Sequence, residues 1–238
     1  MTIHNTSDDT RFIAGSNDIL RRCGVTLTTG SNFGDYKELL AEGRPDHTVG
    51  PPFDPELHDL NEKNAVWIVG RDENGTIMHT QALRALDIGY FPLSEYMRKG
   101  FRSFPPPDVS IDYRRSRYRA GPGARQIRGQ VCYHGEVWLG GTRGQFRGTG
   151  LSAILGRIAF LTAMQRWAPD YLFGIMPKQV AYKGFVERQG YMHTDPGCLR
   201  WFFTGNDQPF ECMMVYMSHE DLRFMLDLPL SEYVEMAA

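Results

Sequence analysis

The sequence has few cysteines and none of the spacings that mark disulfide-rich or zinc-binding proteins. No Cys-x-x-Cys pair occurs, so we expect reduced thiols and no structural zinc. The four cysteines are Cys23, Cys132, Cys198 and Cys212. We therefore expect a cytoplasmic protein that holds no metal.

Long hydrophobic runs are also missing. The best apolar stretch, residues 151–164, is interrupted by Gly156 and Arg157 and is too short to span a bilayer. Residues 1–9 contain neither a basic segment nor an apolar core, which argues against a secretion signal. The sequence thus predicts no membrane partner.

Net charge is close to zero. The 238 residues include 26 Lys and Arg against 28 Asp and Glu, which argues against binding to nucleic acid or another polyanion. Hydrophobic residues make up 42% and charged residues 23%, values that are ordinary for a globular protein. We expect one large domain over residues 1–238.

Alternating apolar residues and turn signals predict the main elements. Residues 65–69 and 76–83 read as a hairpin around Asn74-Gly75, a strong turn signal. Helical apolar spacing predicts a buried helix after residue 150 that Pro169 ends. The later elements expected are strands over 131–139, 171–175, 199–203 and 211–217, and helices over 151–167 and 179–189. This order favours an α/β or α+β fold with a mixed sheet.

The most informative segment is Gln145-Phe146-Arg147-Gly148-Thr149-Gly150, between an expected strand and an expected helix. A glycine-rich turn that opens into a helix presents free backbone N–H groups and the positive end of the helix dipole. Gly148 and Gly150 lack a Cβ, so the main chain can approach a ligand closely. The segment therefore predicts a site for a phosphorylated cofactor.

Two common phosphate-binding patterns do not fit this segment. A P-loop needs Lys-Ser or Lys-Thr after its last glycine, whereas Leu151-Ser152 follows Gly150. A dinucleotide fingerprint fits residues 148–153 but requires an acidic residue at the end of the next strand. That strand is followed by Lys178, and the rest of the chain is too short for a doubly wound sheet.

A third pattern fits better. Gln145, Gly148 and Gly150 lie at the fixed positions of Gln/Arg-x-x-Gly-x-Gly/Ala, and the chain then continues with a strand, a helix and Gly190-Tyr191. In this order and spacing the sequence resembles the GNAT superfamily of acyl-CoA-dependent N-acyltransferases. The resemblance is specific over residues 131–193 and only architectural over 60–87 and 200–217.

The resemblance implies a fold and a co-substrate. The fold would be a mixed, mostly antiparallel twisted sheet flanked by helices and splayed at the strand before the glycine-rich segment. The co-substrate would be acetyl-CoA or another acyl-CoA, wedged between that strand and the next. The residues implied to contact it are Trp138, Leu139, Gly140, Arg143, Gln145, Phe146, Arg147, Gly148, Thr149 and Gly150.

Amide formation from a thioester requires removal of a proton from the amine and polarisation of the carbonyl. Because side chains alternate along a strand, we expect residues 132, 134, 136 and 138 to share one face. By the resemblance a base stands on this strand, and Glu136 is the first candidate and His134 the second. The alternatives are a solvated edge carboxylate and a histidine of the core.

Proton donation to the leaving thiolate is the role for which this sequence departs from the family's pattern. The family's usual donor is a tyrosine four residues before the helix-terminal glycine, and Val186 occupies that position here. Tyr182 lies one turn earlier on the same helical face and is the candidate catalytic acid. Tyr182 could instead belong to the core, in which case water protonates the thiolate or turnover has been lost.

Residues 88–129 form an arginine-rich insert. Residues 98–128 contain eight arginines, one lysine and two acidic residues, an excess that the neutral total hides. The insert could bind a carboxylate on the acceptor or acyl group, since Arg pairs bidentately with carboxylates. It could also reach the 3′-phosphate of the cofactor, or be a solvated face or a contact between subunits of a homodimer.

Three functions stay open. The first is an acetyltransferase or other acyltransferase that acylates the amine of a small molecule, whose pocket we expect from residues 30–60 and 88–129. The second is a long-chain acyl transferase of the autoinducer-synthase or N-acyl amino acid synthase type. The third, motivated by Val186, is a non-catalytic CoA-binding module.

Overall fold

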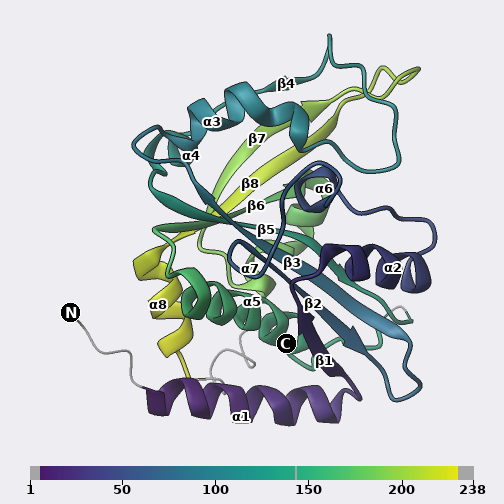
Figure 1. Ribbon diagram of the computed structural model, residues 1–238, viewed down its shortest axis with the longest axis vertical. Coiled ribbons are helices and arrows are strands. Elements are labelled where there is room, and N and C mark those ends of the chain that lie inside the picture. The colour runs from purple at the N-terminus through teal and green to yellow at the C-terminus, as the bar shows by residue number, and fades with distance from the viewer. Residues whose placement is uncertain (1–5, 143, 230–238) are drawn as a thin grey trace.

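The computed structural model describes residues 6–142 and 144–229, which form one eight-stranded sheet in the order β1-β2-β3-β5-β6-β8-β7-β4 (Figure 1). Neighbouring strands are antiparallel except for the parallel pair β5–β6. The strands are β1 (Thr26–Gly30), β2 (Ala65–Arg71), β3 (Ile77–Asp87), β4 (Arg117–Tyr118), β5 (Gln130–Leu139), β6 (Tyr171–Pro177), β7 (His193–Trp201) and β8 (Phe210–Ser218). The predicted mixed, mostly antiparallel sheet is confirmed.

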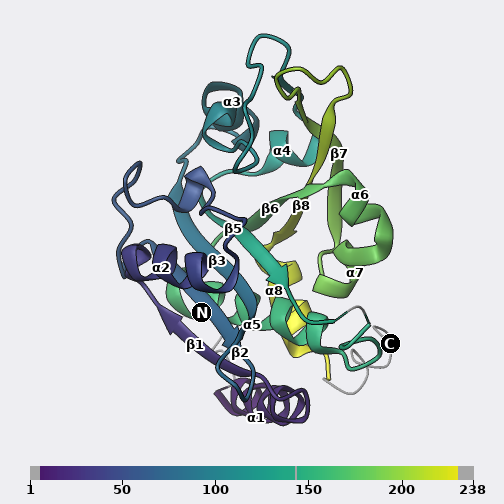
Figure 2. The same cartoon turned by 90° about the vertical axis from the view of Figure 1, so that its right-hand side faces the viewer.

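Helices cover both faces of the sheet. They are α1 (Thr6–Arg22), α2 (Phe33–Gly43), η1 (Pro51–Phe53), α3 (Leu93–Gly100), η2 (Phe101–Ser103), α4 (Pro122–Gln126), α5 (Leu151–Trp167), α6 (Lys178–Val180), η3 (Ala181–Phe185), α7 (Val186–Gln189) and α8 (His219–Asp227). One core joins α2, α3 and α4 to the sheet, and another joins α5, α7 and α8 to it. Figure 2 shows α2 and α7 on opposite sides of the strands.

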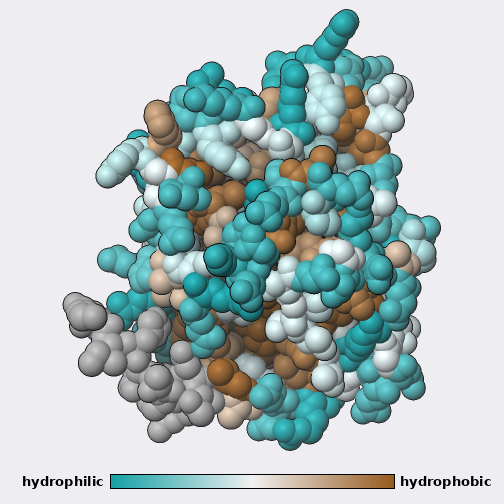
Figure 3. All heavy atoms as spheres, viewed as in Figure 1, coloured by the Kyte–Doolittle hydropathy of each residue, from teal (hydrophilic) through white to brown (hydrophobic). Residues whose placement is uncertain are grey.

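Most of the hydrophobic residues that join the helices to the sheet are buried beneath the surface. In Figure 3 hydrophobic residues show in patches through a mostly hydrophilic outer layer. Helix α5 is the most deeply buried: Leu151, Ile154 and Leu155 are at most 1% exposed. The helix ends as predicted before Pro169, with Ala168 in the left-handed conformation at φ 41°.

The helix expected over residues 179–189 is not continuous, so that prediction is wrong in detail. Gly184 takes a positive φ of 75° and divides the segment into α6, a π-type turn η3 and α7. Glycine adopts this conformation without the steric cost that a Cβ would impose. Apolar periodicity does not reveal such a kink, because the residues on either side keep a helical spacing.

The parallel pair β5–β6 separates soon after it forms. Its register runs from Val131↔Tyr171 to Tyr133↔Phe173 and stops, while β6 continues to pair with β8 as far as Pro177. The predicted splay at the strand before the glycine-rich segment is therefore present. A cleft between two strands of one sheet exposes backbone groups that would otherwise be paired.

Strand β5 also contains a bulge against β3. Gly135 pairs with Ala82 and Trp138 pairs with Thr80, so two residues of β5 face Gln81 alone. Glu136 takes a φ of 56° at this point. A bulge with a left-handed residue redirects the side chains that follow it.

The bulge corrects the prediction that residues 132, 134, 136 and 138 share one face. Cys132 packs in the core beneath α5, and His134 packs against Phe160 of that helix. The side chains of Glu136 and Trp138 instead meet the segment that follows α2. Strict alternation holds only for a regular strand, and one extra residue moves the later side chains to the other face.

Gly156 of α5 lies against the backbone carbonyl of Gln189, and a Cβ at Gly156 would lie 2.3 Å from that oxygen. We expect Gly156→Ala to lower the free energy of unfolding by about 1–3 kcal/mol, because backbone cannot swing aside as a side chain can. Gly100→Ala is the control, since a Cβ at Gly100 would have no atom within 4 Å and the φ of Gly100 is negative. Urea unfolding of both variants checks this; equal stability would contradict it.

Candidate active site

A cavity of about 420 Å³ lies where β5 and β6 separate. The two strands supply residues 133–137 and 174–177 to its wall. The loop after α2 and the segment that follows η2 supply residues 44, 47, 50, 52, 53 and 104–107. These last two segments fall within the regions expected to form the acceptor pocket.

One side of the cavity is aromatic. The rings of Phe53 and Tyr133 stack at 5.5 Å between centroids, and Phe104 meets Tyr133 edge-on at 5.1 Å. Trp201 and Phe210 of β7 and β8 continue this wall. Burial of aromatic surface favours an apolar group as occupant.

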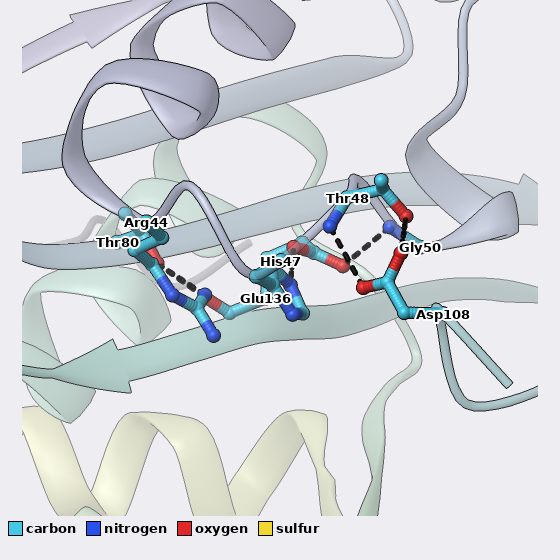
Figure 4. A network of polar contacts seen from close by, with 7 residues as sticks. All are labelled: Arg44, His47, Thr48, Gly50, Thr80, Asp108 and Glu136. Carbon is cyan, nitrogen blue, oxygen red and sulfur yellow. Dashed lines mark hydrogen bonds and ion pairs between the residues drawn. The ribbon is translucent and has the colours of Figure 1, made fainter.

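Among the described residues that line this cavity, Glu136 is the one that carries a carboxylate. Its side chain is only 8% exposed. One oxygen, Oε1, accepts the N–H of Gly50 at 2.9 Å, and Oε2 lies 3.2 Å from Nε2 of His47 (Figure 4). His47 is 22% exposed and lines the cavity together with Glu136.

A second layer of contacts holds Glu136 in the bulge. The hydroxyl of Thr80 donates to the backbone carbonyl of Glu136 at 2.8 Å, and Arg44 donates to that hydroxyl at 3.4 Å. The guanidinium of Arg44 also lies 5.0 Å from the ring centre of Trp138. Burial lowers the pKa of Arg44, and the nearby Glu136 carboxylate raises it in part.

Tyr36 completes this layer from α2. Burial raises the pKa of its phenol well above the usual value, and the charge of Glu136 raises it further. The hydroxyl is therefore protonated and neutral near pH 7. A neutral phenol does not compete with the carboxylate of Glu136 for protons.

The loop after α2 is also tied to the insert. Asp108 accepts the backbone N–H of Thr48 at 2.9 Å and its hydroxyl at 2.7 Å. These bonds lower the pKa of Asp108 and keep the carboxylate ionised. Figure 4 shows that Asp108 and Glu136 both accept hydrogen bonds from this loop, at Thr48 and at Gly50.

His134 occupies a different environment from Glu136. It is buried on the α5 side, with Nδ1 2.8 Å from the hydroxyl of Tyr191 and Nε2 3.1 Å from Oε1 of Gln81. Because the amide nitrogen of Gln81 donates to Leu155, its oxygen must accept, so Nε2 of His134 carries the proton. Burial lowers the pKa of His134 to about 3, which keeps the ring neutral.

Tyr182 is not brought together with Glu136 in this structure. Its side chain is 70% exposed and is absent from the cavity wall, and the ammonium of Lys178 lies 5.9 Å from its ring centre. Val186, at the position where the family has its tyrosine, is buried in the core beneath α5. The structure therefore presents no tyrosine from these two positions to the cavity.

The glycine-rich segment forms a series of tight turns in front of α5. Gly144, Gly148 and Gly150 have φ values of 87°, 71° and 72°, and Gly150 caps the helix without a side-chain hydrogen bond. Gln145 and Arg147 are exposed, and Phe146 and Thr149 are half-buried. Arg143 lies outside the described residues.

Within these turns, side-chain oxygens accept hydrogen bonds from backbone N–H groups. The amide oxygen of Gln145 accepts the N–H of Thr142 at 2.9 Å, and the hydroxyl of Thr149 accepts the N–H of Leu151 at 3.2 Å. The remaining N–H groups of the first turn of α5 have no acceptor within the helix. Left-handed glycines followed by such a helix end form an anion-binding concavity, so the segment fits a diphosphate.

Several backbone groups at the end of β5 are hydrogen-bonded to β3. The carbonyl of Trp138 lies 2.6 Å from Nδ1 of His79, and the N–H of Gly140 donates to Met78 at 2.8 Å. Leu139 pairs with His79. All three residues from 138 to 140 are half-buried, next to the point where the cleft opens.

Sequence reasoning missed His47 and Arg44. Both come from a proline- and glycine-rich segment, and no spacing within it predicts contacts with strand residues 36 positions after Arg44 and 89 positions after His47. The only available signal was the general expectation that residues 30–60 help to build the acceptor pocket.

Comparison with known proteins gives a likeness to solved structures only. No family model and no curated protein matches the chain. It is similar to an N-acetyltransferase from Staphylococcus aureus Mu50, with 12% identity over 82% of this chain and 98% of that one at a TM-score of 0.43. Spermidine N-acetyltransferase from Vibrio cholerae in complex with CoA and spermine shares 8% identity over 84% and 98%, with a TM-score of 0.44.

NAA60 from Arabidopsis thaliana in complex with acetyl-CoA shares 9% identity over 82% of this chain and 98% of that one, with a TM-score of 0.46. Within the described part of the chain, no helix is long and apolar enough to cross a membrane. What these solved proteins bind is a fact about them.

The buried neutral His134 predicts a pH dependence of stability. Its pKa falls from 6.5 to about 3 on folding, so the unfolded chain takes up the proton first as pH falls. The stability is thus fully present above pH 6.5 and is lost progressively below it. We expect His134→Gln to reduce this loss by about 1.4 kcal/mol per pH unit between about pH 5.5 and 4.5.

Urea unfolding at several pH values separates the two effects of this substitution. If the free energy of unfolding of the variant differs from that of wild type by the same amount at every pH, the difference reports lost packing. If the free energy of unfolding changes with pH at a different slope, the difference reports the buried histidine that titrates. Parallel curves for wild type and His134→Gln would contradict the assignment of a neutral, low-pKa ring.

Proposed function

We propose that this protein transfers an acyl group from an acyl-CoA to the amine of a small molecule. The observation that carries the proposal is the cavity at the separation of β5 and β6, which presents the buried Glu136–His47 pair to a space that both strands line. The glycine-rich turns and the open end of α5 stand at the end of the same strand. In this proposal the turns would hold a diphosphate and the cavity would hold the amine.

The donor would be held by the backbone at residues 145–150 and by β5 at residues 138–140. Arg147 adds positive charge from an exposed position, and we keep Arg143 in the proposed set. CoA supplies the thioester when it is bound. The protein's own task there is to fix the thioester carbonyl close to the part of β5 that lies beyond its pairing with β6.

The acceptor amine must lose a proton before it attacks the carbonyl carbon. Glu136 is the proposed base, directly or through His47, which lines the same cavity and lies 3.2 Å from the carboxylate. The N–H of Gly50 fixes the carboxylate, so its orientation costs no rearrangement during the reaction. When the amine nitrogen bonds to the carbonyl carbon and the C–S bond breaks, the thiolate takes a proton at the open side of the cavity.

His134 and Tyr182 remain proposals with narrower roles. His134 supports β5 from the α5 side through Gln81 and Tyr191, and its low pKa keeps it neutral. Tyr182 is exposed in this structure, so a role as proton donor requires that it reach the leaving sulfur in the complex. Water is the alternative proton donor.

The aromatic wall favours a second candidate within the same fold. Phe53, Phe104 and Tyr133, together with Trp201 and Phe210, offer an apolar surface that suits a long acyl chain. Transfer of a long-chain acyl group is therefore the alternative to acetyl transfer. Thermal shifts with acetyl-CoA and a long-chain acyl-CoA compare the two directly.

Replacement of the proposed base tests the reaction. We expect Glu136→Gln to lower kcat by about a hundredfold or more while CoA still binds, because the amide cannot accept the amine proton. Thiol release from acetyl-CoA or a longer acyl-CoA, measured across a panel of amines, is the assay. Glu62→Gln, an exposed carboxylate far along the chain, is the control.

Two outcomes would count against this assignment. Turnover that survives in Glu136→Gln would remove Glu136 from the reaction. Tight binding of CoA by wild type without turnover on any amine would favour the non-catalytic CoA-binding module.

The glycine-rich turns can be tested with a matched pair. Gly148 has a φ of 71° and Gly205 a φ of 79°, and neither has an atom within 4 Å of a Cβ position. A methyl group therefore imposes the same backbone strain at both, about 1 kcal/mol. We expect Gly148→Ala to weaken CoA binding about tenfold and Gly205→Ala to leave it unchanged, as measured by calorimetry.

A further inference from the structure

A second, smaller pocket of about 250 Å³ lies behind the wall of the main cavity. We call it the Arg84 pocket. It is lined by Pro52, His58, Arg84, Tyr96, Lys99, Gly100, Ser103 and Phe104. These residues come from three separate stretches of chain: the loop around η1, the end of β3, and the arginine-rich insert at α3 and η2.

The polar groups of this pocket are donors and cations. Arg84 and Lys99 carry positive charge, and Tyr96 and Ser103 offer hydroxyls. None of the described residues that line the pocket is acidic. Two cations from separate elements face one small space that no described carboxylate lines, which favours an anion there.

Arg84 is the most informative of these residues. It is half-buried, and burial lowers its pKa. Its Nη1 donates to the backbone carbonyl of Pro52 at 2.8 Å, and no ion pair with a described carboxylate accompanies this bond. A guanidinium has five N–H donors, so one carbonyl leaves most of them available.

Other arginines of the chain show the contrast. Arg71, Arg98 and Arg115 lie nearer to solvent and each pairs with a carboxylate, at 3.0, 2.7 and 3.1 Å. Arg84 is buried more deeply than Arg98, and among the described residues its side chain donates to the carbonyl of Pro52 and to no carboxylate. A buried charge that is not paired by the protein is stabilised when a ligand supplies the opposite charge.

Tyr96 and His58 are suited to the same ligand. Burial raises the pKa of Tyr96, so its phenol stays protonated and can donate a hydrogen bond. Burial and the charge of Arg84 lower the pKa of His58, so the imidazole is neutral near pH 7 and also carries an N–H. Tyr96 and His58 are half-buried and line the same pocket as Arg84, so hydrogen-bond donors and a guanidinium are available to an acceptor-only group.

We propose that the Arg84 pocket binds a small organic anion through a carboxylate or phosphate group. The planar guanidinium of Arg84 holds two of its oxygens side by side, and Lys99 adds a point charge from α3. The pocket shares Pro52 and Phe104 with the main cavity. Its occupant therefore lies directly behind the wall that faces Glu136.

The shared wall connects the pocket to the loop that holds the carboxylate. The carbonyl of Pro52 accepts from Arg84, and two residues earlier the N–H of Gly50 donates to Glu136. An anion on Arg84 thus adds order to the segment on which the orientation of Glu136 depends. Binding at this pocket does not require the proposed acyl transfer and can be measured on its own.

Calorimetry and thermal shift with two probes test the proposal. Sodium acetate and inorganic phosphate are titrated into wild type at constant ionic strength set with sodium chloride, and their comparison tells a carboxylate ligand from a phosphate ligand. We expect saturable binding of at least one probe. Arg84→Gln should weaken it about tenfold or more, as loss of a charge-assisted pair does, and Lys99→Gln less.

Arg98→Gln is the matched control, because Arg98 is an exposed arginine of α3 beside the pocket and should not alter binding. If Arg84→Gln does not fold, Lys99→Gln and Ser103→Ala, both exposed positions, carry the test. No saturable binding of either probe to wild type, or equal binding by Arg84→Gln, would overturn the proposal. Loss of binding in Arg44→Gln but not in Arg84→Gln would place the anion in the main cavity and overturn it as well.

Discussion

The bulge in β5 is the constraint on which the candidate site depends. Glu136 takes a left-handed conformation, and this single departure from regular strand geometry carries its carboxylate across the sheet to the loop after α2. A non-glycine residue in this conformation costs about 1 kcal/mol or more, so the surrounding contacts must hold it. The hydroxyl of Thr80, the N–H of Gly50 and the ring of His47 provide those contacts.

The opposite face of β5 keeps the strand in register while the bulge distorts it. His134 bonds to Gln81 of β3 and to Tyr191 beyond α7, and all three side chains are buried. A fully satisfied polar network of this kind is specific in its geometry, because a shift of the strand by one residue would leave several polar groups unpaired. The hydrogen bonds of His134 thus fix the position in β5 at which the bulge begins.

The sequence predicted the parts of the structure that depend on local rules. The hairpin at Asn74-Gly75, the buried helix α5 and the glycine-rich turns before it follow from spacing and turn chemistry. The shared face of residues 132–138 was predicted wrongly, since period-two alternation carries no sign of an inserted residue. His47 and Arg44 were not predicted because their contacts join positions that only the finished fold brings together.

The hydrogen bonds between Thr48 and Asp108 bear on how the chain folds. These two residues are 60 positions apart, and the bond from His47 to Glu136 spans 89. Closing such long loops costs chain entropy that only late, non-local contacts repay. The wall of the cavity is therefore held by contacts between distant segments of the chain, and a single cut in the exposed chain between η2 and β4 is expected to loosen this wall while the strands of the sheet stay paired.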